Sequence, residues 1–214
     1  MKTKIVQNVS KNQLRRFPVY LSYLKGKKSE GVNSISAPSI AEALGYNEVQ
    51  VRKDLAIVSK TEGKPKSGRD IQALISDLES FLSYNDVTNA VIVGVGHLGM
   101  ALLSYKGFSN YGLNILAGFD DAEDIIGKEY NGKTVFPMSK LTNLINRLQV
   151  HIGIIAVPDK YAQEVADRLV ESGIRAIWNF APVHLNVPDN IIVQDENMAS
   201  SLAILSRRLK GVID

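Results

Sequence analysis

Three glycines and one aspartate stand at a spacing that suits nucleotide binding. Gly94, Gly96 and Gly99 form a Gly-x-Gly-x-x-Gly pattern, and Asp120 follows 21 residues after the last of them. In dinucleotide-binding folds, such glycines permit a tight turn, approach of a pyrophosphate to the backbone, and close packing of helix on strand. Amides at the helix start then face the phosphates, and the acid binds ribose hydroxyls. The pattern therefore predicts a dinucleotide site, with a purely structural glycine turn as the alternative.

The residues around the pattern predict the elements that would position it. An apolar run at 90–93 precedes the first glycine, and apolar residues at helical spacing begin within five residues after it. A second apolar run at 115–119 leads directly into Asp120. A strand before the glycines, a helix after them and a strand before the acid favour nucleotide binding over the structural alternative.

Further along the chain, short apolar runs alternate with helical patterns. Strands are expected at 134–136, 151–157, 175–178 and 191–193, and helices at 138–148, 159–172 and 195–210. This alternation predicts an α/β fold with a doubly wound parallel sheet, whose ligands bind at the carboxyl ends of the strands. Two more strand ends should therefore share a rim with the glycine turn, namely Ala156, Val157 and Pro158, and Asn179, Phe180 and Ala181.

Composition narrows the class of protein. The chain has 214 residues, of which 45% are hydrophobic and 22% charged, as in soluble globular proteins. It has no cysteine, which excludes disulfides, thiol switches and cysteine-held iron–sulfur clusters. No apolar run reaches the roughly 18–20 residues of a membrane span, and the start lacks a secretory signal. We expect a cytoplasmic protein without a membrane partner.

The first third of the chain is basic and carries a candidate DNA-binding motif. Residues 1–80 have 14 Lys and Arg against 8 Asp and Glu, whereas residues 81–214 have 11 against 14. A helix is expected at 13–25 and a loop at 25–32. Two short helices should follow, one capped by Ser36 and ended by Gly45, the other capped by Asn47 and running over 48–59. They match a helix-turn-helix whose second helix points Gln50, Arg52 and Lys53 outward, where such residues contact bases and phosphates; an ordinary helical hairpin is the alternative.

A basic, glycine-containing stretch follows this motif. Residues 61–70 read as a loop or short hairpin and would form a wing against the DNA backbone; a solvated linker is the alternative. Its candidate DNA contacts are Lys64, Lys66 and Arg69. A helix is expected at 71–82, and polar residues 83–86 then mark the best domain boundary. We expect a DNA-binding domain at 1–83, a nucleotide-binding domain at 84–194 and a terminal helix at 195–214.

Two other classes of protein compete with a DNA-binding sensor. A dehydrogenase needs an acid or base near the nicotinamide, and of the three histidines only His184 follows a strand end on the expected rim. No catalytic motif, acidic metal cluster or second substrate domain is present, so we expect neither an enzyme nor a metal protein. The other class is a CoA- or nucleotide-binding module that signals to a protein partner instead of DNA.

The residues resemble those of the Rex redox-sensing transcriptional repressors over nearly the whole chain. The Val-Arg-Lys-Asp and Asn-Phe-Ala-Pro segments are the specific part, since a dinucleotide-binding fold alone does not require them. The matching stretches are 50–55, 94–103, 118–120, 156–158, 162–167 and 179–182.

The resemblance implies a winged helix-turn-helix domain, a Rossmann-like NAD(H)-binding domain, and a homodimer whose terminal helices swap between subunits. Such a dimer would bind a palindromic operator when NAD⁺ dominates and leave it when NADH binds. The alternative is an NAD(H) sensor with altered DNA binding that acts on a protein partner. The implied cofactor contacts are Gly94, Val95, Gly96, His97, Leu98, Gly99, Tyr105, Asp120, Ala156, Val157, Pro158, Asn179, Phe180, Ala181 and Met198.

The chain departs from the family pattern at three positions. Arg69 stands where the wing usually has a tyrosine, and Ser22 replaces an arginine of the first helix. Asn197 aligns with an aspartate that begins the terminal helix in the family. The last two belong to a polar switch with Tyr105, so the sequence supports ligand binding better than DNA recognition, and DNA recognition better than the switch.

Overall fold

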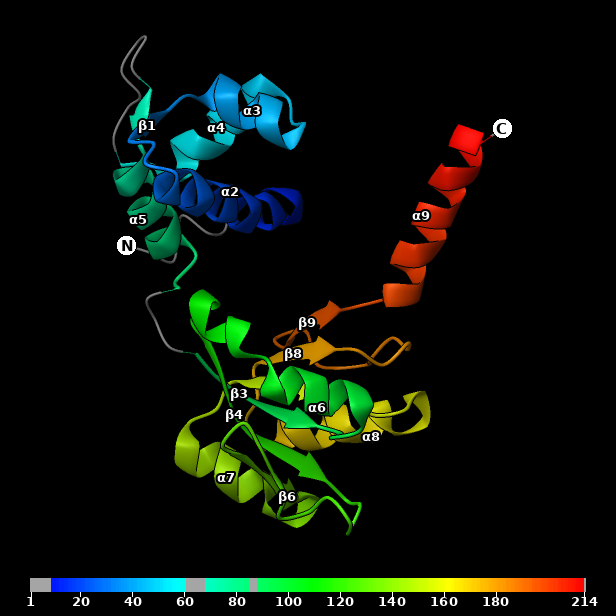
Figure 1. Ribbon diagram of the computed structural model, residues 1–214. Coiled ribbons are helices and arrows are strands. Elements are labelled where there is room, and N and C mark those ends of the chain that lie inside the picture. The colour runs from blue at the N-terminus through cyan, green and yellow to red at the C-terminus, as the bar shows by residue number, and fades with distance from the viewer. Residues whose placement is uncertain (1–8, 61–67, 85–87, 214) are drawn as a thin grey trace. The chain divides into compact units, whose positions relative to one another are not determined.

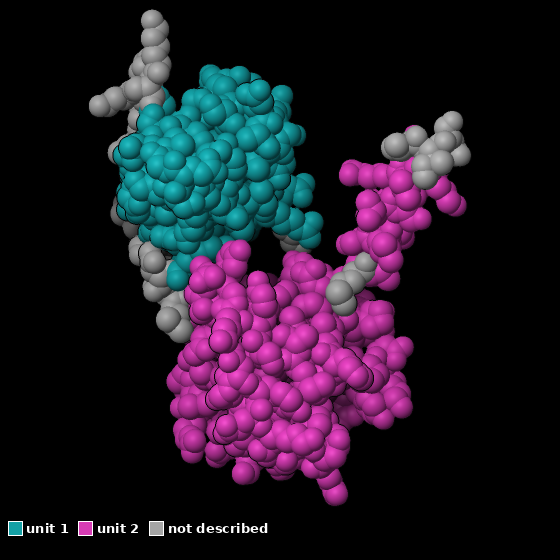
Figure 2. All heavy atoms as spheres, viewed as in Figure 1, with its two compact units in different colours: residues 1–86 teal, residues 87–214 magenta. Residues whose placement is uncertain are grey.

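The computed structural model describes residues 9–60, 68–84 and 88–213 (Figure 1). The chain divides into two compact units, residues 1–86 and 87–214 (Figure 2). Each unit has its own hydrophobic core. None of the described helices is both long and apolar enough to cross a membrane.

The first unit is helical. It contains α2 (Lys11–Ser29), α3 (Ala37–Leu44), α4 (Glu48–Val58) and α5 (Ile71–Phe81), and β1 (Ser34–Ile35) pairs antiparallel with β2 (Arg69–Asp70). The predicted caps are confirmed: the Ser36 and Asn47 side chains accept backbone amides of α3 and α4, and Gly45 ends α3 with φ of 67°. The side chains of Phe17, Tyr20, Leu24, Leu55 and Leu78 are among those that form the core.

Helix α2 is longer than predicted. It begins at Lys11, where Ser10 and Gln13 form a capping box, and it runs through Pro18 to Ser29. The predicted loop at 25–32 was therefore wrong for its first five residues. Phe17, Tyr20 and Leu24 are completely buried, and burial of this face outweighs the hydrogen bond that a proline inside a helix removes.

The second unit is an α/β sheet. Its described strands are ordered β5-β6-β4-β3-β7-β8-β9, and every neighbouring pair is parallel except β5 and β6. This confirms the doubly wound parallel sheet; the antiparallel edge strand β5 was not predicted. The strands are β3 (Thr88–Val93), β4 (Leu113–Asp120), β5 (Glu129–Tyr130), β6 (Lys133–Pro137), β7 (Ile152–Ile155), β8 (Ala176–Asn179) and β9 (Ile192–Asp195).

Helical segments connect β3 to β4, β6 to β7 and β7 to β8, and they cover both faces of the sheet. Along β3, Val91 and Val93 belong to one core cluster, and Ala90 and Ile92 to another. Burial on both faces explains why the strand reads as a continuous apolar run. The helical segments are α6 (His97–Ser104), the 3₁₀ helices η1 (Lys106–Tyr111) and η2 (Met138–Lys140), α7 (Leu141–Leu148) and α8 (Asp159–Glu171).

The terminal helix α9 (Met198–Ile213) begins three residues later than predicted. Asp195 instead closes β9, which pairs with β8, and the side chain of Asn197 accepts the Ser200 amide at 2.8 Å. Every described side chain of α9 is exposed, including the apolar ones of Leu202 (65%) and Leu205 (62%). An apolar helix face in water lacks the partner that normally stabilises it.

Candidate functional site

The three glycines occupy different environments in the turn between β3 and α6. Gly94 has φ of +89°, and a Cβ there would lie 2.7 Å from the carbonyl oxygen of Ala156. A Cβ at Gly99 would collide with the carbonyl oxygen of Gly94, whereas a Cβ at Gly96 would meet nothing within 4 Å. Gly94 thus permits the conformation of the turn, Gly99 permits close packing of helix on strand, and Gly96 leaves open space beside the backbone. A dinucleotide-binding turn requires these three features.

Asp120 holds this turn against the end of β4. Its carboxylate accepts the Val95 amide at 2.7 Å and the amides of Asp121 and Ala122 at 2.8 and 3.0 Å. A carboxylate has about four lone-pair positions, so one remains for a ribose hydroxyl. The predicted ribose acid therefore also fixes the backbone of the predicted pyrophosphate turn.

A cleft of about 630 Å³ opens between the glycine turn, the end of β4 and the start of α8. Of the candidate cofactor residues, it is lined by Gly94, Val95, Gly96, His97, Asp120, Ala156, Val157 and Pro158. Helix α8 adds Tyr161, Glu164 and Arg168, which sequence reasoning missed. Their i, i+3, i+7 spacing predicts one helix face, but the sequence does not say that this face borders a cleft.

The remaining candidates are not among the residues that line that cleft, and an aromatic row connects two of them. Tyr105 packs on Phe108 (4.9 Å between ring centroids), Phe108 on Trp178 (5.7 Å), and Trp178 on Phe180 (4.6 Å). Tyr105 is 55% exposed. Sequence reasoning missed Phe108 and Trp178. Leu98, Gly99 and Ala181 also do not line the cleft, and the side chain of Met198 lies outside the described residues.

Asn179 is completely buried and its amide is used within the protein. Its nitrogen donates to the Val183 carbonyl at 2.9 Å and to Asp195 at 2.8 Å, and its oxygen accepts the Ala181 amide at 3.0 Å. These bonds hold the loop that follows β8 against strand β9. Its side chain thus shapes the rim from within instead of facing it.

Helix α4 presents two of its three candidate DNA contacts to solvent. Arg52 is exposed and forms an ion pair with Glu48, and Lys53 is exposed as well. Gln50 was expected to point outward, yet it is half-buried and its amide faces Arg16 of α2. In the wing region, Arg69 lies in β2 and donates to Ser59 at 2.9 Å, while Lys64 and Lys66 lie outside the described residues.

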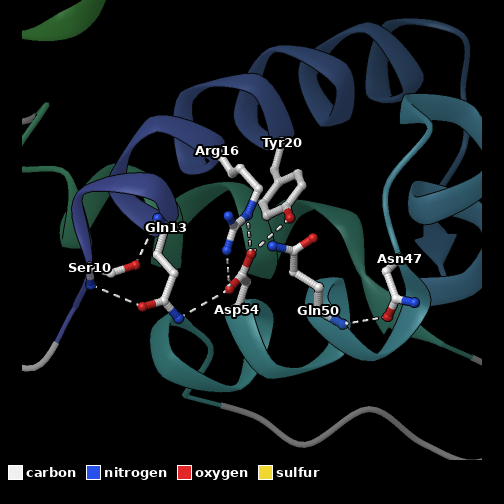
Figure 3. Close-up of polar contacts among 7 residues, drawn as sticks. All are labelled: Ser10, Gln13, Arg16, Tyr20, Asn47, Gln50 and Asp54. Atoms are coloured by element: carbon white, nitrogen blue, oxygen red, sulfur yellow. Dashed lines mark hydrogen bonds and ion pairs between the residues drawn. The ribbon is translucent and has the colours of Figure 1, made fainter.

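A buried carboxylate joins α4 to α2 (Figure 3). Asp54, only 1% exposed, accepts two hydrogen bonds from Arg16 at 2.7 and 2.9 Å, one from Tyr20 at 2.9 Å and one from Gln13 at 3.2 Å. Burial alone raises the pKa of Asp54, but these donors outweigh it and the pKa is lowered. Burial raises the pKa of Tyr20, so its hydroxyl stays protonated and donates.

Both units match models of known protein families. A model described as a CoA binding domain matches residues 85–183, and one described as a putative DNA-binding protein N-terminus matches residues 8–56. The redox-sensing transcriptional repressor Rex of Treponema denticola is 43% identical over 192 residues, which is 90% of this chain and 91% of that protein. The chain belongs to the Rex family. The Rex of Porphyromonas gingivalis is 39% identical over 93% of this chain and 91% of its own.

Solved Rex structures share the fold along nearly the full length. The crystal structure of RSP, a Rex-family repressor, in complex with NAD⁺ and operator DNA has a TM-score of 0.89 and 33% identity, covering 95% of this chain and 93% of that chain. RSP in complex with NADH has a TM-score of 0.86 and covers 95% of each chain. The Rex family consists of transcriptional repressors, so the dehydrogenase alternative is not supported.

Proposed function

We propose that this chain is a redox-sensing transcriptional repressor that binds operator DNA with residues 1–83 and NAD(H) with residues 84–194. The observation that carries the proposal is the glycine turn held by Asp120, in the same chain as a capped helix-turn-helix whose second helix, α4, exposes Arg52 and Lys53. The RSP structures, with NAD⁺ and operator DNA in one and NADH in the other, support both ligands. A repressor of this kind acts in the cytoplasm, where its DNA lies.

NADH can release the operator only if it binds the DNA-incompetent arrangement more tightly than the competent one. The glycine turn and Asp120 would contact parts that NAD⁺ and NADH share. Discrimination must therefore arise near the nicotinamide, which is charged only in NAD⁺. We assign this role to the aromatic row from Tyr105 to Phe180 and to the terminal helix of a second subunit.

The experiment that tests the proposal is a mobility shift on DNA from upstream of the chain's own gene. The wild-type chain should retard that DNA with NAD⁺ present and release it when NADH is added. Retardation that NADH does not change would contradict the redox sensor. Binding of NADH without any DNA binding would favour the sensor that acts on a protein partner.

Cofactor choice should depend on Asp120. We expect NADH to bind at least tenfold more tightly than NADPH, about 1.4 kcal/mol, because the carboxylate favours ribose hydroxyls and repels a 2′-phosphate. Asp120→Asn keeps an oxygen for the Val95 amide but loses the charge, so this preference should shrink. Calorimetric titration with both nucleotides measures it, and the exposed Glu123→Gln serves as the control. An unchanged preference in Asp120→Asn would remove Asp120 from the ribose site.

Dimerisation and sensing should both depend on α9. We propose that its exposed apolar face packs on a second copy of the chain, so that α9 is swapped between the two subunits. Deletion of residues 197–214 leaves Glu196, which accepts the Trp178 indole N–H at 3.1 Å, and so preserves β9. This deletion should give a monomer in sedimentation and abolish a preference of at least tenfold for NADH over NAD⁺.

A point variant separates loss of the interface from loss of the chain end. Leu205→Asp places a charge on the apolar face and should also give monomers, whereas the neighbouring Ser206→Asp adds the same charge and should leave the dimer intact. A truncated chain that still dimerises and still distinguishes NADH from NAD⁺ would overturn the swapped-helix proposal, even if the repressor assignment survives.

A further inference from the structure

The guanidinium of Arg16 lies between two side chains of α4, Asp54 and Gln50 (Figure 3). Its Nε donates to one carboxylate oxygen of Asp54 at 2.7 Å and its Nη2 to the other at 2.9 Å. A bidentate pair of this kind fixes the plane of the guanidinium. The same carboxylate is held by Tyr20 and Gln13, so Arg16 cannot turn away without leaving a buried charge unpaired.

The fixed guanidinium determines how the Gln50 amide is oriented. Oxygen and nitrogen of an amide have nearly the same shape, and the hydrogen bonds decide which is which. With nitrogen toward Arg16, as drawn in Figure 3, donors would oppose donors, because a guanidinium accepts no hydrogen bond. In the exchanged orientation, the Gln50 oxygen accepts from Nη1 at 2.9 Å and from Nη2 at 3.3 Å. The amide nitrogen, with two hydrogens to donate, then points away from Arg16.

Gln50 lies where a recognition helix meets base edges. It is the third residue of α4 after the N-cap Asn47, and residues at the start of a recognition helix make the base contacts. Gln50 also lines an open groove of about 580 Å³, together with Asn47, Val49 and Lys53. If α4 enters the major groove, as the proposed function requires, the Gln50 nitrogen is the part of its amide available to DNA.

We propose that Arg16 makes Gln50 a donor-only reader of DNA. A glutamine with a free amide recognises adenine by donating to N7 and accepting from the N6 amino group. With its oxygen held by Arg16, Gln50 is limited to donating, and it fits an acceptor edge: guanine O6 and N7, or thymine O4. Arg16 and Asp54 act through Gln50 as positioning residues. This inference rests on the proposed function and names the base chemistry that its recognition helix selects.

Two substitutions of Gln50 in the full chain test the donor. Gln50→Glu keeps an oxygen for Arg16 but replaces the donating nitrogen by oxygen, while Gln50→Met removes both polar atoms at similar length. On the upstream duplex that the wild type binds, we expect Gln50→Glu to bind at least fivefold more weakly than Gln50→Met. Val49→Glu, on the adjacent exposed residue, measures how much of that loss a new negative charge causes by itself. Equal binding after this correction would overturn the inference.

A panel of duplexes with single base-pair changes identifies what Gln50 reads. The wild type should discriminate by about 5- to 150-fold at one guanine or thymine of each half-site, the range for a specific base contact, and Gln50→Met should lose that discrimination alone. Discrimination at an adenine that Gln50→Met abolishes, or a loss that is uniform over the panel and therefore reports a phosphate contact, would overturn the inference.

Arg16→Lys tests the positioning role. Lysine keeps a positive charge beside Asp54 but lacks the planar fork that holds carboxylate and amide together. The thermal transition should persist, while adenine becomes tolerated at the position that Gln50 reads. Unchanged base preference in Arg16→Lys would show that Arg16 serves only the fold. A wild-type chain that binds no upstream duplex overturns the proposed function, and this inference with it, before any variant is made.

Discussion

Replacing Asp54 by alanine is expected to destabilise the first unit by about 3–5 kcal/mol. The loss of one partner leaves the other charge of a buried pair uncompensated, and this costs far more than an exposed pair is worth. The Arg16 side chain is 12% exposed and the Asp54 side chain 1% exposed. The hydroxyl of the completely buried Tyr20 would lose its acceptor as well. Helices α2 and α4 should separate, and operator binding should disappear with them.

The measurement can separate the two units within the full chain. The single tryptophan, Trp178, lies in the second unit, so its fluorescence follows that unit during urea denaturation. Circular dichroism at 222 nm reports helices of both units, and so it includes the unfolding of the helical first unit. Asp54→Ala should shift a circular dichroism transition without shifting the tryptophan transition, and Glu42→Ala, an exposed carboxylate on α3, should shift neither. A decrease of less than about 1 kcal/mol in the free energy of unfolding would show that the Arg16–Asp54 pair contributes as little as a surface pair.

The same carboxylate should make the first unit sensitive to acid. The pKa of Asp54 is lowered from its ordinary 3.8, because the hydrogen bonds from Arg16, Tyr20 and Gln13 outweigh burial. Its stabilising contribution is therefore complete above about pH 4 and is lost as pH falls through the lower pKa of the folded state. Asp54→Asn should remove this part of the pH dependence. If the free energies of unfolding of the Asp54→Asn variant and the wild type change in parallel between about pH 2 and pH 5, Asp54 is not the source of this acid sensitivity.

Local signals predicted the elements that carry the two candidate sites. Helices α3 and α4 were placed within one residue because Ser36, Asn47 and Gly45 act through their own backbone neighbours. The strands before the glycine turn and before Asp120 were found because burial on both faces of a parallel sheet requires unbroken apolar runs. Such features depend on neighbours in sequence, so a single sequence displays them.

Contacts between distant residues explain what the sequence did not predict. Arg16 and Asp54 are 38 residues apart, so nothing in the sequence pairs them. The inward turn of Gln50 follows from that pair. Strand β5 is two residues long and exists only through its pairing with β6. Asp195 extends β9 because it pairs beside β8, although an aspartate before an apolar periodic stretch resembles a helix start.

Of the glycine substitutions, Gly99→Ala is expected to have the largest effect on the second unit. A Cβ at this position collides with the carbonyl oxygen of Gly94, a backbone atom that cannot rotate away. Helix α6 would have to move off β3, at a cost of about 3 kcal/mol, the upper part of the usual range for overpacking. Because α6 and the turn would supply the phosphate-binding amides, NADH affinity should fall at least 100-fold.

Gly96→Ala is the matched comparison, since the two changes are chemically identical and lie three residues apart. A Cβ at Gly96 meets no protein atom within 4 Å, so urea denaturation followed by Trp178 fluorescence should give wild-type stability. That Cβ would nevertheless occupy the space through which a pyrophosphate approaches the turn, and NADH affinity should fall at least tenfold. Stability lost only in Gly99→Ala, with affinity lost in both, identifies the turn as a nucleotide site. If Gly96→Ala keeps full affinity for NADH, the glycines serve only the packing of α6 on β3, and the nucleotide must bind elsewhere.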